Sequence, residues 1–386
     1  MELNKLGDPR AAAPTAGASP GEAVLYRLAG RSLEAAAAAD SAAFDGQIAA
    51  AIDRLLDATD GKSLAALFDH APSPAVHRHL WRILAQRART ARDAQATLGV
   101  HLFAIPLVIV AGPAGAAGTR VIAPGTLANA SALAALLREH DALAGNQAFA
   151  FADALVSADA IDLDRLPGLL REARLDDVAA GVPPLSLAPS PVAVEGGEAA
   201  HLRFLVGSAL AAGHVDLTSS RDTGRWGMPL ARALIGQLAT PGITVIALPR
   251  PAQPLPVAVA QGRAAHREIA ASLFVSHALR EFRAGVGEPV AVLSAHRAAD
   301  VPGGGELRLS LSSPFSPRDA YGFRCPLHAG EQVRDVATML VDLLRDCRVT
   351  DIRVIAGVHP DRDTLTGAPL LYKPGTIPPA AQSVVH

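Results

Sequence analysis

Beyond Glu198 the sequence alternates between short apolar segments and longer segments with helical periodicity, and this restricts the fold more than any other feature. Strands interleaved with helices are typical of an α/β layer arrangement. The segment ELRLSLSS (306–313) alternates polar and apolar residues and is expected to be half exposed, whereas ITVIAL (243–248) is apolar and is expected to be buried. A sheet containing both kinds of strand is predicted to be mixed and covered by helices. The other predicted strands are HLRFLVG, HVDLT, PVAVLSA and DIRVIAGV, and the predicted helices are MPLARALIGQLA, VAQGRAAHREIAASLFVSHALREFRAG and EQVRDVATMLVDLLRDC.

The first hundred residues have helical periodicity instead. One predicted helix carries an apolar stripe at three- and four-residue intervals, made of Phe44, Ile48, Ile52, Leu55 and Leu56. A later one carries arginines around its whole cylinder, which favours a solvated surface over a nucleic-acid face. His77 and His79 on that helix are two residues apart and therefore do not share a face, so no metal site is expected. The predicted fold class is α/β with an all-α N-terminal region.

The apolar segment HLFAIPLVIVAG (101–112) has no polar face, as expected for a strand buried on both sides. The glycine-rich GPAGAAG (112–118) follows it, but the glycine spacing differs from that of a dinucleotide-binding turn and a strand rather than a helix is predicted next. We therefore expect a flexible hairpin connection and no cofactor. The segment AFAFADALVSADAI (148–161) is predicted to be helical.

A chain of 386 residues exceeds what one hydrophobic core usually supports, so two or three domains are expected. GVPPLSLAPSPV holds four prolines among small residues and is the best candidate linker. The predicted organisation is a disordered tail over 1–20, a helical region over 21–98, an α/β segment over 99–180, a Pro-rich linker over 181–192, an α/β domain over 193–365 and an irregular tail over 366–386.

Charge and cysteine content restrict the expected binding partners and cellular compartment. A net charge of -2 gives no overall electrostatic reason to expect nucleic acid or an anionic membrane as partner. The N-terminus lacks the apolar core of a secretory signal, and the longest apolar run is about half the length of a membrane span. Cys325 and Cys347 form no zinc-binding spacing, and Cys347 is interpreted as a buried thiol of a cytoplasmic protein.

Candidate chemistry lies in three loops at strand ends, where ligands gather in α/β sheets. The first is 219–226, the second is SAHRAAD (294–300) and the third is GVHPDRD (357–363). Their arginines suit a carboxylate or phosphate, and their histidines suit proton transfer. Each loop can instead be explained by turn and packing residues, with Trp226 filling space between helix and sheet. The candidate catalytic residues are His296 and His359, and the candidate ligand-binding residues are Ser219, Ser220, Arg221, Asp222, Arg225, Trp226, Arg297, Asp361 and Arg362.

Two functions of different classes follow. Because the catalytic motifs of several common enzyme classes are missing and the helices are rich in alanine, the first is a cytoplasmic, non-catalytic interaction or assembly protein whose partner is another protein or a second copy. The alternative is an α/β enzyme acting on an anionic small molecule, phosphorylated or carboxylated, held by the strand-end loops. This alternative requires that the strand-end loops reach the same edge of the sheet.

Overall fold

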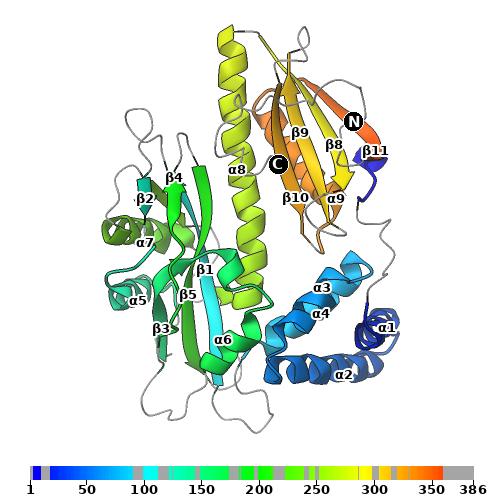
Figure 1. Cartoon of the computed structure of the whole chain (residues 1–386), viewed down its shortest axis with the longest axis vertical. Helices are drawn as coiled ribbons and strands as arrows, with labels where there is room; N and C mark the ends of the chain where they lie inside the picture. The colour runs from blue at the N-terminus through cyan, green and yellow to red at the C-terminus, as the bar shows by residue number, and fades with distance from the viewer. Residues whose placement is uncertain are drawn as a thin grey trace. The chain divides into compact units, whose positions relative to one another are not determined.

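The structure is a computed structural model, described here for residues 3–9, 18–89, 99–111, 121–123, 125–143, 148–173, 182, 184–194, 199–211, 222–238, 243–247, 252–285, 287–297, 304–313, 320–328 and 330–359. It is a mixed α/β protein (Figure 1). The chain forms two compact units, and the boundary between them falls within one long helix, Leu255–Gly285. The larger comprises Gly17–Glu195 and Ala200–His266, and the smaller comprises Met1–Ala16, Gly196–Ala199 and Arg267–His386. The candidate linker 181–192 lies inside the larger unit.

The N-terminal region of the larger unit is helical, as the periodicity predicts. Proline at the first turn and a serine side chain accepting from a helix amide begin two of its helices, at Ser19 and Ser73. Asp60 caps a third in the same way. These helices are α1 (Pro20–Glu34), α2 (Ala38–Asp57), α3 (Gly61–Asp69) and α4 (Pro74–Arg87).

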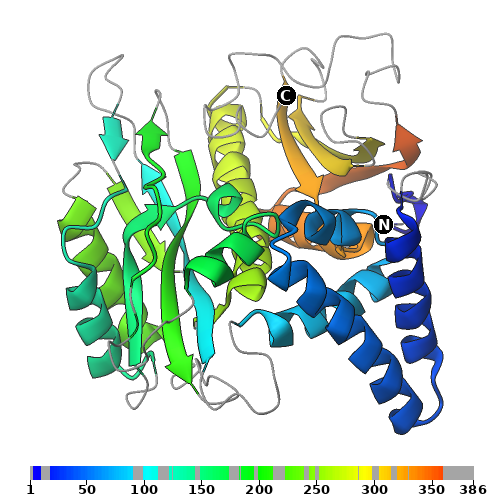
Figure 2. The same cartoon turned by 60° about the horizontal axis from the view of Figure 1, so that its bottom comes forward.

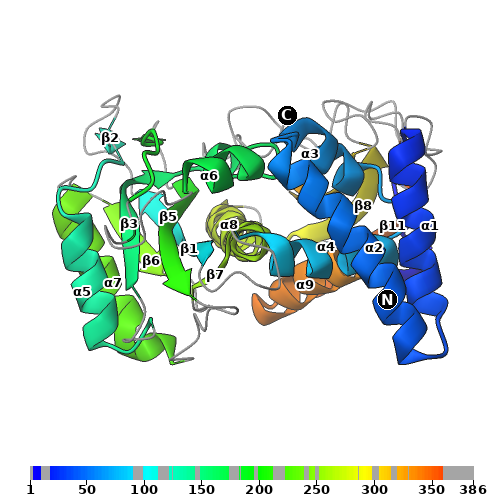
Figure 3. The same ribbon diagram turned by 90° about the horizontal axis from the view of Figure 1, so that it is seen from below.

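The same unit contains a five-stranded sheet in the order β3-β5-β1-β6, with β7 paired to β1, and a two-stranded sheet of β2 and β4. Helices α5 and α7 lie on one face of the larger sheet (Figure 3). The strands are β1 (Gly99–Ala111), β2 (Val121–Ala123), β3 (Ala148–Val156), β4 (Val192–Val194), β5 (Ala199–Ala211), β6 (Ile243–Ala247) and β7 (Gln253–Pro254). The helices are α5 (Ala130–Glu139), η2 (Ala158–Ala160), α6 (Leu166–Glu172), α7 (Thr223–Leu238) and the first part of α8 (Leu255–Gly285).

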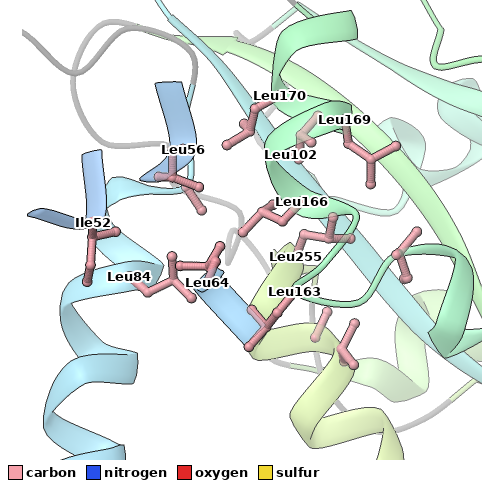
Figure 4. Close-up of a cluster of buried hydrophobic side chains, with 14 of the residues drawn as sticks. Ile52, Leu56, Leu64, Leu84, Leu102, Leu163, Leu166, Leu169, Leu170 and Leu255 are labelled. Atoms are coloured by element: carbon pink, nitrogen blue, oxygen red, sulfur yellow. The ribbon is translucent and has the colours of Figure 1, made fainter. Parts of the chain in front are cut away.

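Strand β1 is buried on both faces, which confirms the expectation from its continuous apolar sequence. Phe103 and Leu107 pack with α5 and α7, whereas Leu102 and Ala104 pack into a second cluster with the N-terminal helices, α6 and the start of α8. Figure 4 shows part of that second cluster. Burial of apolar side chains thus stabilises the packing of β1 on both of its faces.

The smaller unit is built on a four-stranded sheet in the order β10-β9-β8-β11. Strands β8, β9 and β10 pair antiparallel, and β11 pairs parallel with β8, so the sheet is mixed. The second part of α8 and α9 supply its hydrophobic core on one face, with α9 drawn in orange in Figure 2. The elements are η1 (Leu3–Lys5), β8 (Val290–Arg297), β9 (Gly305–Ser312), β10 (Ala320–Leu327), α9 (Val333–Asp346) and β11 (Asp351–His359).

Three sequence-based expectations are wrong. The segment predicted as a helix at 148–161 forms strand β3, because Phe149 and Phe151 alternate with small residues and pair with β5. All eight residues of β9 are buried, so the strand expected to be half exposed has a covered polar face. Cys347 is only partly buried, because it lies at the C-cap of α9, while Cys325 is the buried thiol.

Other expectations fall outside the described residues, including GPAGAAG, the strand HVDLT and the C-terminal tail. The strand predicted after GPAGAAG is present as β2, and it pairs with β4 rather than returning along β1. Within the described residues, no helix is long and apolar enough to cross a membrane.

Candidate functional site

Two of the three candidate loops leave the sheet of the smaller unit at the same edge. Strand β8 ends at Arg297 and β11 ends at His359, and the two strands run parallel. The register places His359 directly beside His296. The carboxyl ends of neighbouring parallel strands are where ligands bind in open α/β sheets. The structure therefore brings the two candidate catalytic histidines together.

Strand alternation gathers more polar side chains beside them. On β8 and β9, alternate apolar residues such as Leu293 and Leu307 enter the core under α8 and α9. The residues between them share the opposite face, because side chains in a strand alternate between the two sides. In register, Ser294 lies opposite Arg308, Arg308 opposite Arg324, and His296 opposite Glu306. We call Ser294, His296, Glu306, Arg308, Arg324 and His359 the strand-end cluster.

The centre of the cluster is a carboxylate held between two guanidinium groups. Arg308 Nε donates to Glu306 Oε1 and Arg324 Nε donates to Glu306 Oε2, each at 2.5 Å. Glu306 is only 1% exposed. Taking such charges out of water is costly, and apolar residues of similar volume are often at least as stable. The buried network is therefore weak evidence for a stabilising role.

The histidines form the other half of the cluster. Ser294 Oγ and His296 Nε2 are 2.8 Å apart, and His296 is 3% exposed. The rings of His296 and His359 are tilted, with centroids 5.5 Å apart. The buried Nε2 atom of His359 makes no hydrogen bond with the described residues. A buried polar nitrogen of this kind is uncommon and marks a place where a ligand group can bond.

A second buried ion pair lies in the same unit but involves the core face. Arg267 on α8 pairs with Glu331, which also accepts from the backbone amide of His328. Cys325 lies nearby, and burial raises the pKa of its thiol to about 12 although the charge of Arg267 opposes the shift. A thiol with so high a pKa stays protonated at neutral pH and is a poor nucleophile.

The third candidate loop belongs to the larger unit. Asp222 accepts a hydrogen bond from the amide of Gly224, and Arg225 forms an exposed 3.8 Å ion pair with Asp141. Trp226 is 1% exposed and packs in the core with α5 and α7. Arg225 and Trp226 lie in the first turn of α7, which begins at Thr223, before the start predicted from the sequence. Their contacts are those of helix-surface and packing residues. The loop's role in ligand binding stays a prediction.

The remaining candidates are not brought together. Arg297 is exposed at the end of β8, and strand alternation places it on the face opposite the cluster. Ser219, Ser220, Arg221, Asp361 and Arg362 lie outside the described residues.

Sequence reasoning missed Glu306, Arg308 and Arg324. A signal was present, because β9 carries glutamate and arginine two residues apart, on one face of a strand. The charged pattern favoured a solvent-exposed face, and only the strand pairing shows that Arg324 and Ser294 lie alongside.

Another histidine network, in the N-terminal helices, is explained by packing. Asp45 accepts from Ser32 Oγ at 2.6 Å and from Arg82 at 2.8 Å, and it lies 2.8 Å from His79 Nε2. Burial raises the pKa of Asp45, but these hydrogen bonds and charges outweigh it and lower the pKa overall. His77 instead stacks on Trp81. The described residues contain no group of three or more side chains suited to a metal ion, and the two histidines face different neighbours.

Comparison with known proteins identifies no relative, since no family model, curated protein or solved structure matches the chain.

Proposed function

We propose that this protein binds an anionic small molecule, carrying a carboxylate or phosphate group, at the strand-end cluster. The observation that carries the proposal is the register between β8 and β11, which sets His296 beside His359 at the carboxyl ends of two parallel strands. The neighbouring strands add arginine, serine and glutamate side chains at the same edge.

Hydrogen-bonding capacity supports an anion as the ligand. Arg308 and Arg324 place two guanidinium groups, each with five N–H donors in a fixed fork, beside Glu306. Arginine forks bind carboxylate and phosphate groups in two-point contacts. Ser294 and the Nε2 atom of His359 add further hydrogen-bonding groups at the same edge. The cluster therefore suits an oxyanion better than a cation or an apolar ligand.

If the protein converts the anion that it binds, it is an enzyme acting on that anion. Histidines near a substrate exchange protons at neutral pH more readily than other side chains. His296 and His359 are the residues that would carry that role, and a cytoplasmic location remains part of the same proposal.

A thermal-shift screen tests the binding. Phosphate, pyrophosphate, dicarboxylates and phosphorylated sugars are added to the full-length protein, and the unfolding midpoint is followed. A ligand at about 100 times its dissociation constant should stabilise the native state by about 2.7 kcal/mol. His359→Gln should reduce the gain, because it removes an imidazole nitrogen from the edge, while Arg353→Gln should keep it, because Arg353 is exposed and pairs with Asp351. Stabilisation that is equal in both variants, or none with any anion, contradicts the proposal.

The interaction or assembly protein remains a second candidate, favoured by the surface of α1. Val24 and Leu33 on this helix are 44% and 50% exposed. Exposed apolar side chains can contact another protein or a second copy. These two lie on opposite sides of α1, because nine residues turn a helix by about two and a half turns. Sedimentation velocity over a range of concentrations tests self-association, and Val24→Asp with Leu33→Asp should abolish it. Monomeric wild-type protein at every concentration rules out the second copy as the partner.

A further inference from the structure

The first residues of the chain contact the last described strand. Residues 3–9, part of the tail expected to be disordered, form η1 and a short extended segment beside β11 (Figure 1). Leu6 makes a parallel bridge with Gly357, and Leu3 and Leu6 pack against the core of the smaller unit. Pro9 is buried. We call residues 3–9 the N-terminal strap.

The strap meets β11 where that strand is irregular. Val354 pairs with Leu293 and Val358 pairs with Ala295, so four residues of β11 advance against two of β8. The extra residues form a bulge, and Gly357 within it has φ +85°, which side-chain-bearing residues rarely adopt. Bulges bend a strand and redirect the side chains that follow, and they are frequent beside functional sites.

The side chain that follows this bulge is His359. The register after the bulge, Val358 with Ala295 and His359 with His296, places the histidine in the strand-end cluster. The strap lies against the same residues, because a Cβ atom on Gly7 would be 2.7 Å from Val358 Cγ2. Thus the backbone of the strap directly contacts the two residues that precede His359.

We propose that the N-terminal strap holds the bulge of β11 in place and thereby positions His359 in the strand-end cluster. The effect on ligand affinity rests on the proposed anion binding, whereas the effect on His359 itself does not. Two partly buried leucines, one bridge and one buried proline are among the contacts of the strap. Terminal segments open at a lower free energy than the core, so release of the strap does not require global unfolding. Release removes the contact of the strap with the bulge, while the pairing of β11 with β8 remains.

The test follows His359 directly, without ligand. Ring-labelled histidine gives one NMR signal for each of the 13 histidines, and the signal lost in His359→Gln belongs to His359. Leu6→Asp, or removal of residues 2–9, should shift the His359 signal while the histidines of the larger unit keep theirs. Leu33→Asp is the matched control, because it likewise replaces a leucine by an aspartate but at an exposed position of α1. It should leave the His359 signal unchanged. An unchanged His359 signal in both strap variants overturns the proposal.

A reversible lock separates positioning from a general loss of structure. Gly7→Cys with Val358→Cys replaces the close contact by a disulfide, in a background where Cys347→Ser removes the partly exposed thiol. With Leu6→Asp added, oxidation should restore the His359 signal and reduction should shift it again. A signal that ignores the redox state contradicts the proposal even if a strap variant proves unstable.

Ligand measurements then distinguish the two proposals. If an anion binds the wild-type protein, displacement of the strap should weaken its affinity about tenfold, which corresponds to about 1.4 kcal/mol. If no anion binds while the His359 signal responds as expected, the proposed function fails and the strap still positions His359. If an anion binds equally well with and without the strap and the signal stays unchanged, only the strap proposal fails.

Discussion

Glu306 is a residue whose replacement should strongly destabilise the smaller unit. Glu306→Gln removes the charge that both Arg308 and Arg324 contact at 2.5 Å in a buried setting. Breaking a buried ion pair by removing one partner typically costs about 3–5 kcal/mol. Urea unfolding should show a loss of that size, whereas Asp351→Asn, in the exposed pair with Arg353, should leave the midpoint near that of the wild type. A loss equal to that of Asp351→Asn would mean that Arg308 and Arg324 tolerate the removal of the Glu306 charge.

His201 should give the larger unit a pH-dependent stability. Burial, followed by the charges of Arg203 and His266, lowers the pKa of His201 to about 4. An unfolded histidine has a pKa near 6.5. As pH falls below about 6.5 the unfolded state takes up a proton before the native state does, so protonation favours unfolding. The stabilising contribution is complete above that pH and is lost as pH falls towards 4.

Urea unfolding at pH 7.5 and pH 5 measures this loss. His201→Gln does not titrate, so its free energy of unfolding should fall less between the two pH values than that of the wild type. His277→Gln, on a partly exposed position of α8, is the control and should keep the wild-type dependence. Equal pH dependence in wild type and His201→Gln would show that the pKa of His201 is the same in the native and unfolded states.

At the scale of elements, α3 begins where another segment leaves no space. A Cβ atom on Gly61 would lie 1.7 Å from the carbonyl oxygen of Asp164, so backbone must move to accept any side chain. Gly61→Ala should therefore destabilise by at least about 2 kcal/mol. Gly30→Ala in α1 has nothing within 4 Å and should stabilise by about 0.5–1 kcal/mol, because alanine favours a helix. Thermal unfolding of both variants compares them, and a neutral Gly61→Ala would show that α3 shifts freely.

Sequence periodicity predicted the elements in which a simple apolar pattern matches the buried surface. The stripe of α2 appears as buried Ile48, Ile52 and Leu56, and the continuous apolar run of β1 is a strand covered on both faces. β3 was missed because its alanine-rich sequence also suits a helix, and only pairing with β5 decides the matter. Local preference is weak where long-range strand pairing competes with it.

The candidate site was predictable only in part for a related reason. Histidines at strand ends are visible in the sequence, so His296 and His359 were identified. Their separation of about sixty residues gives no sign that β8 and β11 run parallel as neighbours. The burial of Glu306 and Arg308 could not be predicted either, because alternation of charged and apolar residues normally indicates a solvated face.

At the scale of the whole chain, two compact units each have a hydrophobic core of their own. Phe323 is buried in the smaller unit with Phe274 stacked on it, and Leu80 is buried among the N-terminal helices of the larger unit. Units with separate cores are expected to lose structure separately, although the helix α8 belongs to both.

Hydrogen exchange measured by mass spectrometry can show whether a core substitution in one unit affects that unit alone or both units. Phe323→Ala should cost about 3–5 kcal/mol and speed exchange in β8, β9 and α9, while β1 and β3 keep their protection. Leu80→Ala should cost about 2–5 kcal/mol and have the opposite distribution, because its cavity opens in the core shared by α4 and α2. Faster exchange in both units after either substitution would mean that α8 couples them into one cooperative structure. In that case strain at the His266–Arg267 division would reach both cores, and the strand-end cluster would depend on packing in the larger unit.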